Sequence, residues 1–431
     1  MEKPDQKEPV INFKFINWKS SLLAAIVFFY LLLFGLWISE GDFPAKYGVD
    51  YTAFWSIGKI ADEKGYSQIY DLNNLRTVQI QERQTLGLPV NTDTHSYSPI
   101  PAPFFAFFVP PFQLLSRINP LSGYWIWTLF NLVFLILYLV FFINKIFPAS
   151  STQINGLKVL VLMLISFPVF INMITGQVEV LLLICAGEFL RNALRNKPIL
   201  SGIWLGGLLL KPQLLILIVP LFFIMRYWRV LAGFMVSAGI IVATSLLLSG
   251  FAGMEALFNL WTRFSGDIVA NSPELMVNWR MIGVNLNTLL NTSLGWIITA
   301  LGIVLTTLAV YFLVRHKQPY GSPSWVMTMT GVFTATLAIT WHSHYHMALV
   351  LIPFLIYAFL YDLIPEKIIF LWVIVTPIAW FAMGIISGFI PPLAAVNAQG
   401  MTFAFCGFIL NLAVLVAAIR FMRKNSLIKV K

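Results

Sequence analysis

The stretch SSLLAAIVFFYLLLFGLWI, residues 20–38, contains no charged residue along its whole length. A helix needs about 20 apolar residues to cross the hydrocarbon core of a bilayer, so this stretch predicts a membrane span. Its apolar core is too long for a cleaved signal peptide, and the sequence LWISEGDF at its end offers no cleavage site between small residues. We therefore predict an uncleaved first helix, preceded by a cytoplasmic tail of residues 1–19.

Apolar runs of similar length recur along the chain. Of its 431 residues, 58% are hydrophobic and 11% are charged, whereas soluble domains have about 25% charged residues. This composition excludes a soluble globular protein. It predicts an all-α polytopic membrane protein with about 12 transmembrane helices, formed as a single domain by residues 1–431. The later runs cover residues 121–143, 157–174, 177–194, 199–210, 212–225, 229–249, 286–314, 323–341, 345–361, 367–387 and 401–421.

The basic residues predict how the chain is oriented. The net charge is +10, and most of the basic residues lie in short polar breaks between alternate apolar runs. Such loops remain in the cytoplasm, so the N-terminus and the tail 422–431 are predicted to be cytoplasmic, with the protein in the plasma membrane. The long segments, chiefly residues 40–120, then face outward, and the working surface is expected there. Topology accounts for the positive charge, which does not indicate a nucleic-acid partner.

Two apolar segments could each form either one continuous membrane helix or an interrupted one. Residues 98–116, SPIPAPFFAFFVPPFQLLS, contain five prolines, which disfavour a regular membrane helix. We predict a bent segment lying against the outer leaflet. Residues 199–225 are predicted to form two short helices broken at KPQ, residues 211–213. One long helix would place the basic C-terminal tail outside.

The stretch DYTAFWSIGKIADEKGYSQIY, residues 50–70, has apolar or small residues at three- and four-residue spacing. This spacing predicts a helix with one apolar face, and its charged opposite face predicts that it lies flat on the bilayer surface. Asp50 occupies the N-cap position. It either only caps this helix or supplies a general base at the membrane edge. Asp42, in the turn-like sequence EGDFP, is a second candidate acid.

Three further outer positions could bind an anionic or polar substrate. Lys211 lies between Leu210 and Pro212 in an apolar context, which indicates either a functional cation paired with an anion or a lysine snorkelling to the interface. Arg280, in NWRMIG, could clamp a phosphate through two hydrogen bonds. Gln177, in the turn TGQVEV, presents an amide, whereas Glu179 two residues later is expected to favour the helix dipole.

Three of the five histidines, His342, His344 and His346, fall in the sequence TWHSHYHMALVLIP, residues 340–353. Their alternate spacing favours a turn or an extended segment over a helix. We interpret them as hydrogen-bonding groups that carry a proton or hold a phosphate. Interfacial histidines without a substrate role are the alternative. A zinc site has little support, because no HExxH pattern or neighbouring carboxylate accompanies them, so no metal is predicted.

Taken in order, these stretches resemble glycosyltransferase family 87. These are membrane enzymes of the GT-C type that use polyprenyl-phosphate sugars, among them phosphatidylinositol-mannoside mannosyltransferases. The resemblance spans about residues 20–355. It is carried by GVDYTAFWSIGKIADEKGYSQIYD, YSPIPAPFFAFFVPPFQLL, INMITGQVEVLLL, SGIWLGGLLLKPQLLILIVPLF and WHSHYHMALVLIP.

The resemblance implies a GT-C-type fold and an inverting, cofactor- and metal-independent transfer of a sugar, with mannose expected. The donor would be a polyprenyl-phosphate sugar and the acceptor a lipid or glycan, among membrane lipids on the outer face. The family's base falls on Asp50, and its basic positions fall on Lys211 and on His344 or His346. The chain departs from the family's YPP at Tyr97, where it reads YSP, and from adjacent histidines, where it reads HYH.

Two other classes of protein remain as alternatives. A transporter or flippase of lipid-linked sugars would also be polytopic, but such proteins often have inverted repeats and ionisable residues near the bilayer midplane. Here no repeat is visible in the sequence, and the ionisable residues gather in outer segments. A non-catalytic assembly subunit would leave the acid and the cations of these segments unexplained.

Overall fold

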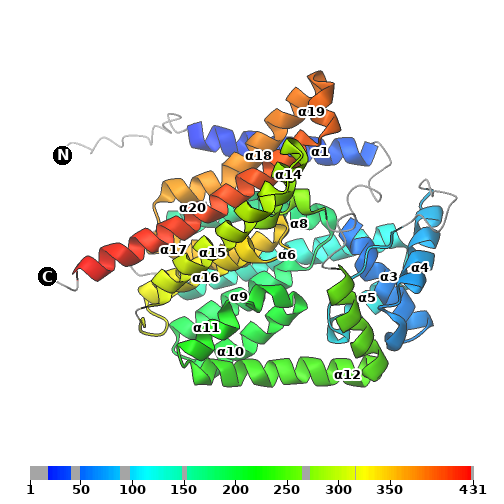
Figure 1. The fold of residues 1–431 in the computed structure, drawn as a ribbon, viewed down its shortest axis with the longest axis horizontal. Coiled ribbons are helices and arrows are strands. Elements are labelled where there is room, and N and C mark those ends of the chain that lie inside the picture. The colour runs from blue at the N-terminus through cyan, green and yellow to red at the C-terminus, as the bar shows by residue number, and fades with distance from the viewer. Residues whose placement is uncertain are drawn as a thin grey trace, which may run out of the picture.

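The computed structural model describes residues 18–39, 49–87, 98–147, 153–264, 272–315 and 317–428, and every regular element among them is a helix. The all-α prediction is therefore confirmed for this part of the chain. The tail 1–17 and two predicted site residues, Asp42 and Tyr97, lie outside the described residues. The helices form a bundle whose long members run roughly side by side (Figure 1).

Long apolar helices make up the frame of the bundle. Among the described residues, five of them are long and apolar enough to cross a membrane, and the pair α7–α8, bent by 46°, gives a sixth if it counts as one span. This composition supports a multi-pass membrane protein. These helices are α6 (Pro120–Ile146), α7 (Gln153–Ile165), α8 (Phe167–Thr175), α12 (Trp228–Phe264), α15 (Leu294–Val314), α18 (Glu366–Phe389) and α20 (Ala398–Ile428).

Shorter helices complete the bundle, and the predicted number of about 12 spans depends on them. Their length alone does not make them spans, so that number stays a prediction. They are α1 (Trp18–Ser39), α9 (Glu179–Leu194), α10 (Pro198–Gly206), η3 (Gly207–Leu210), η4 (Pro212–Leu215), α11 (Ile218–Ile224), α14 (Trp279–Leu290), α16 (Pro323–Ile339), η6 (Tyr345–Leu351) and α17 (Ile352–Leu360), with η5 (Pro273–Leu275) and α19 (Pro391–Ala395) between them.

The predicted break at residues 211–213 is confirmed. Lys211 has φ −134° and ψ 82°, which is not helical, and it separates η3 from η4. Pro212 explains the break, because proline disfavours a helical conformation in the residue before it.

The predicted span 286–314 is wrong in its first part. Helix α14 ends at Leu290, Asn291 adopts the left-handed conformation with φ 47°, and α15 begins only at Leu294. Asparagine tolerates this conformation better than most residues, so it ends the helix inside an otherwise apolar run.

Polar contacts bring the ends of several helices together at one end of the bundle. The Glu366 carboxylate accepts hydrogen bonds from Lys19 at 3.1 Å and Lys158 at 2.8 Å, which joins the starts of α18, α1 and α7. The Tyr361 hydroxyl donates to the Ile146 carbonyl at 3.2 Å, so α6 and α17 end there too. We call this end the basic end. Helices α3 (Val49–Glu63), α4 (Leu72–Thr85) and α5 (Pro110–Leu115) gather at the opposite end (Figure 1).

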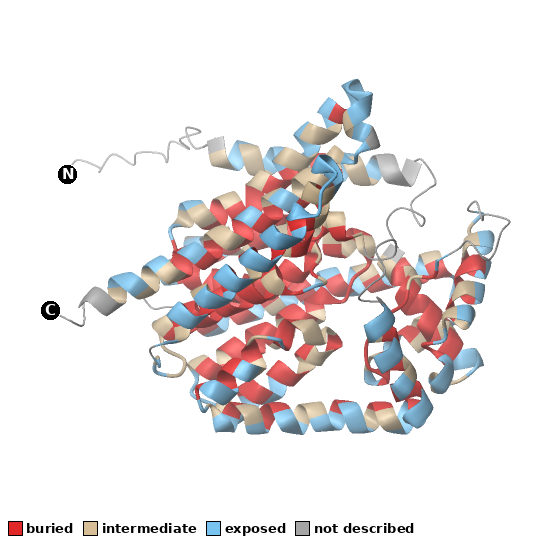
Figure 2. Cartoon of the chain, viewed as in Figure 1, coloured by how far each residue is buried: buried red, intermediate tan, exposed pale blue. Residues whose placement is uncertain are grey.

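The buried residues follow the middle of the bundle (Figure 2). Helix α16 is buried at every position from Trp325 to Ala338. Helices α10 and α12 touch through glycines, since a Cβ at Gly202 would lie 1.9 Å from the Val230 carbonyl oxygen and one at Gly233 would lie 2.0 Å from that of Ile199. Such close approach of small residues is a common way for membrane helices to pack.

The helix predicted to begin near Asp50 is α3, and its apolar face is confirmed. Tyr51, Phe54 and Trp55 are all buried. Protein covers this face, however, so the prediction that it rests on a bilayer is wrong: the Phe54 ring lies 5.5 Å from that of Phe104 and 5.1 Å from that of Phe112. The N-cap prediction is also wrong, because Asp50 lies within the first turn of α3.

The segment that covers α3 is the proline-rich stretch of residues 98–116. As predicted, it forms no regular membrane helix: residues 98–105 are irregular, and only η2 (Ala106–Phe108) and α5 follow. A further short helix, η1 (Tyr66–Gln68), joins α3 to α4. The residues from Ile100 to Phe104 therefore belong to the protein interior at the end opposite the basic end.

Candidate functional site

A cavity of about 380 Å³ opens at the end of the bundle opposite the basic end. This volume suits a small-molecule site. It brings together seven of the nine candidate residues, namely Asp50, Gln177, Lys211, Arg280, His342, His344 and His346. The other lining residues are Ala53, Phe54, Ile100, Pro101, Ala102, Pro103, Phe104, Leu210, Pro212, Gln213, Ile216, Trp261, Thr340 and Trp341.

The turn between α8 and α9 places Gln177 in this cavity. Gly176 ends α8 in the left-handed conformation with φ 70°, and the Gln177 amide donates to the Asn172 carbonyl at 3.0 Å. Glycine adopts this conformation without strain. The Trp127 indole donates to the Gly176 carbonyl at 2.9 Å, and the Asn172 side-chain oxygen accepts from the Glu179 amide at 3.2 Å. Both sides of the turn are therefore held in place.

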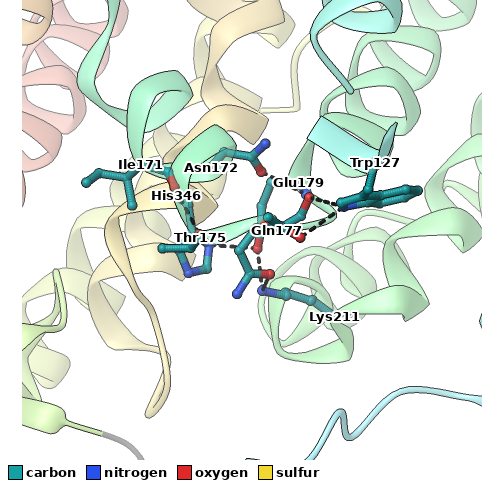
Figure 3. A network of polar contacts seen from close by, with 9 residues as sticks. Trp127, Ile171, Asn172, Thr175, Gln177, Glu179, Lys211 and His346 are labelled. Carbon is teal, nitrogen blue, oxygen red and sulfur yellow. Dashed lines mark hydrogen bonds and ion pairs between the residues drawn. The ribbon is translucent and has the colours of Figure 1, made fainter. Parts of the chain in front are cut away.

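Glu179 is fully buried beside the cavity and contacts one lysine and one histidine. The Lys211 ammonium donates to its Oε1 atom, and His346 Nδ1 lies 2.8 Å from the same oxygen (Figure 3). Lys211 also donates to the Gln177 side-chain oxygen at 3.2 Å. We call Gln177, Glu179, Lys211 and His346 the Glu179 cluster. A buried charge is tolerated when it is paired, so each member stabilises the charge of another.

Sequence reasoning predicted a partner anion for Lys211 but did not identify it. Glu179 was expected only to favour the helix dipole, and it does lie in the first turn of α9. Lys211 follows 32 positions later, at the break between η3 and η4. The lysine in an apolar run was a signal that some buried carboxylate must lie nearby, and only the fold shows which one.

Arg280 reaches the cavity because the start of α14 is tied to the histidine segment. The Val277 amide donates to the Ser343 carbonyl at 2.8 Å, and the Asn278 side chain donates to the Thr340 carbonyl at 2.7 Å. The Arg280 guanidinium stacks 4.5 Å from the Trp341 ring centre and is only 4% exposed. Its Nη1 atom donates to the Trp341 carbonyl at 3.4 Å, and its Nε atom is buried without a hydrogen-bond partner among the described residues.

His342 and His344 lie in a non-helical segment between α16 and η6, as predicted, whereas His346 is the second residue of the 3₁₀ helix η6, so the prediction is wrong for this histidine. All three line the cavity, while the intervening Ser343 and Tyr345 are buried behind them. The rings of His342 and His344 lie 4.8 Å apart. Burial and then the nearby Lys211 lower the pKa of His342 to about 3, so this side chain is neutral at physiological pH.

Asp50 lines the cavity from the first turn of α3. Its side chain is half-buried, and within the described part of the chain no hydrogen bond or ion pair engages its carboxylate. The next residue, Tyr51, packs against the turn at Gly176 and edge-on against the Tyr124 ring at 5.8 Å. This packing fixes the start of α3, so Asp50 is positioned but remains open to a ligand.

The apolar wall of the cavity comes from the proline-rich segment, a role that sequence reasoning missed. The Gln79 side chain donates to the Ile100 carbonyl at 2.7 Å and accepts from its amide at 2.9 Å. The Trp261 indole donates to the Pro103 carbonyl at 2.7 Å. Prolines leave backbone carbonyls free to accept such bonds. The segment therefore lines the cavity, and its contact with an outer leaflet stays a prediction.

Within the described ranges, no group of three or more His, Cys, Asp or Glu side chains is arranged to hold a metal ion. The polar groups that the cavity offers are therefore one open carboxylate, two cations, two amides and three imidazoles. This set can accept a proton at one place and bind an anion at another.

The comparisons with known proteins give one result. Residues 102–340 match the model of glycosyltransferase family 87, a range that covers more than half of the chain. The range includes Gln177, Glu179, Lys211 and Arg280, whereas Asp50 precedes it and the histidines follow it. No curated protein matches the sequence.

Proposed function

Because the chain belongs to glycosyltransferase family 87, we propose that it transfers a sugar, with mannose expected, from a polyprenyl-phosphate donor to a lipid or glycan acceptor. The observation that carries this proposal is that one cavity contains Asp50, whose carboxylate has no partner among the described residues, together with two cations, Lys211 and Arg280. Transfer from a lipid phosphate needs both kinds of group.

Asp50 is the proposed general base. It accepts the proton of the acceptor hydroxyl as that oxygen attacks the anomeric carbon of the donor sugar. The new C–O bond forms while the bond from the anomeric carbon to the phosphate oxygen breaks, which inverts the anomeric centre. A base must be within hydrogen-bond reach of the proton that it takes. The open position of the Asp50 carboxylate at the cavity suits this role.

Arg280 and Lys211 are the proposed binders of the departing phosphate. Lys211 is already paired with Glu179, whereas the Nε atom of Arg280 lacks a partner among the described residues. We therefore assign the closer hold on the phosphate to Arg280 and a supporting electrostatic role to Lys211. His344 and His346 add donors on the same side. Groups that stabilise developing charge often make the largest contribution to catalysis.

The remaining polar groups are proposed to contact the sugar. The side chain of His342 is neutral and that of Gln177 is an amide, so both can exchange hydrogen bonds with hydroxyl groups. Asp42 and Tyr97 stay predicted pocket residues outside the described part. The apolar wall from Ile100 to Phe104, with Ile216 56% exposed at the rim, is proposed to accommodate the first isoprene units of the donor.

The proposed setting is the plasma membrane, with both termini in the cytoplasm and the cavity on the outer side. In this proposal residues 1–431 form one GT-C-type domain of about 12 spans. The separation of the basic end from the cavity supports it, because cytoplasmic ends are rich in lysine and arginine.

The proposal is tested with Asp50→Asn in the purified full-length protein. A panel of polyprenyl-phosphate sugars, beginning with mannose, is offered with a lipid acceptor, and products are identified by mass spectrometry. We expect transfer to fall by a factor of about 10² to 10⁴, the usual contribution of a general base. Glu63→Gln is the matched control, because Glu63 lies on the same helix, outside the cavity, and pairs only with Lys59. Full activity of Asp50→Asn would refute the assignment.

A flippase of lipid-linked sugars is separated from a transferase by the fate of the donor. In vesicles containing the protein, a transferase releases polyprenyl phosphate, whereas a flippase moves the intact lipid to the other leaflet. Movement of intact lipid without release would favour the flippase.

A further inference from the structure

A second cavity, of about 820 Å³, lies at the basic end of the bundle between α15, α20 and the start of α16. It is distant in the fold from the candidate site, because α16 has its start beside this cavity and its end at Thr340 beside the other. We call it the basic-end cavity. The proposed transferase mechanism makes no use of it.

One wall of the basic-end cavity is apolar and outward-facing. Leu305, Leu308 and Phe312 of α15 line it and are 63%, 48% and 55% exposed. They continue the apolar surface of α15, one of the helices long enough to span a membrane. Contact between this surface and water is unfavourable, whereas an acyl chain would cover it well.

The rim of the cavity is basic. Arg315, Lys317 and Arg423 line it, and none of the described lining residues is acidic. The Arg315 guanidinium lies 5.3 Å from the centre of the Phe312 ring, and the Lys317 ammonium lies 5.2 Å from that of Tyr227. These cation–π contacts orient the two cations without using a hydrogen-bond acceptor. Their N–H groups can therefore bind a phosphate.

We infer that the basic-end cavity binds an anionic phospholipid of the leaflet opposite the candidate site. Arg315, Lys317 and Arg423 hold its phosphate headgroup, and an acyl chain lies along Leu305, Leu308 and Phe312. Basic pockets between membrane helices at their cytoplasmic ends bind lipid headgroups of this class. The apolar wall, continuous with a lipid-facing helix, favours a membrane lipid over a soluble phosphate compound.

The first test measures lipid binding to the full-length protein in detergent by native mass spectrometry. Phosphatidylglycerol is titrated against phosphatidylcholine, and preferential binding of phosphatidylglycerol is expected. The triple variant Arg315→Gln, Lys317→Gln, Arg423→Gln should weaken phosphatidylglycerol binding roughly 100-fold, since each basic residue near a headgroup contributes about fivefold.

A matched control removes the same charge at the same end of the bundle. Arg195, Lys197 and Arg229 are exposed and lie outside the cavity, so the variant with glutamine at these three positions should bind phosphatidylglycerol like the wild type. Equal losses in both triple variants would overturn the site and indicate only a diffuse charge effect. Equal binding of phosphatidylcholine and phosphatidylglycerol would overturn it as well.

A third variant distinguishes a lipid from a soluble phosphate. Ala309 lines the apolar part of the cavity, and Ala309→Trp would fill the space for the acyl chain while leaving all three cations in place. We expect it to lose at least tenfold in phosphatidylglycerol affinity, with its unfolding temperature recorded to establish that it folds. Unchanged binding by the folded variant, or displacement of the lipid by millimolar inorganic phosphate, would refute an acyl-chain site.

Discussion

Among the described residues, two carboxylates are each shared by two basic side chains, and the two sites differ mainly in burial. Glu179 is 0% exposed and pairs with Lys211 and His346 beside the candidate site. The Glu366 side chain is 39% exposed and pairs with Lys19 and Lys158 at the basic end. The chemistry of the contacts is similar, but water screens only the second set.

The difference indicates that the same arrangement serves two purposes. Exposed ion pairs contribute about 0 to 1 kcal/mol each, so Glu366 chiefly helps to align the starts of α1, α7 and α18. Removing one partner of a buried pair leaves a charge without water or counterion, which costs about 3 to 5 kcal/mol. The Glu179 cluster is therefore a part of the fold on which the cavity depends.

The largest effect is expected for Glu179→Gln. This variant keeps the volume of the side chain but leaves the Lys211 ammonium beside a neutral amide. We expect the free energy of unfolding to fall by about 3 kcal/mol and sugar transfer to be lost. Denaturant titration in detergent micelles measures the first quantity and product formation the second. An unfolding free energy within 1 kcal/mol of the wild type would show that burial does not increase the contribution of this cluster to stability.

Glu82 provides a third case for the comparison, because this carboxylate is buried and no ion pair engages it within the described part of the chain. Thr52 donates to its Oε1 atom at 3.2 Å, and its Oε2 atom lacks a partner among the described residues. Burial raises the pKa of Glu82 to about 8. Between the unfolded pKa near 4.5 and this value, the folded protein binds more protons than the unfolded chain, so its stability falls as the pH rises.

We therefore expect Glu82→Gln to remove this pH dependence. From pH 6 to pH 9 the wild type should lose about 2 kcal/mol more stability than the variant. Unfolding temperatures measured across this pH range give the comparison. Parallel curves for the two proteins would mean that the Glu82 carboxylate is charged in the folded state at pH 6.

The smallest effect is expected for Glu366→Gln. It removes both exposed contacts, and we expect a loss of no more than about 1 kcal/mol, reduced further at high salt, with sugar transfer unchanged. The same micelle titration, repeated at low and high salt, measures this loss. A loss as large as that of Glu179→Gln would break the comparison.

Local patterns in the sequence predicted much of the fold. The spacing of Tyr51, Phe54 and Trp55 predicted the apolar face of α3, which depends on a few neighbouring residues. The break beside Lys211 was predicted from the distribution of basic residues along the chain. The apolar runs likewise predicted most helices, but Asn291 ended one of them, because a single left-handed residue leaves the average hydropathy of a run almost unchanged.

The candidate site could be predicted as a set of residues but not as an arrangement. Asp50, Lys211, Arg280 and the histidines were each marked by a polar group at the edge of an apolar run, and all of them line one cavity. Their partners were not predictable. Glu179 meets Lys211 across 32 positions, and the proline-rich segment covers the apolar face of α3. Such contacts depend on how helices pack, and no local pattern encodes them.

The length of helix α16 sets the distance between the two cavities. Its 17 residues run from the basic-end cavity to the candidate site, and at 1.5 Å per residue they span about 25 Å. The helix is buried from Trp325 to Ala338, so its neighbours hold it in place. Its length is close to the thickness of a bilayer's hydrocarbon core, about 30 Å. The two cavities thus lie at opposite ends of this helix, and a headgroup bound at one leaves the other free for a substrate.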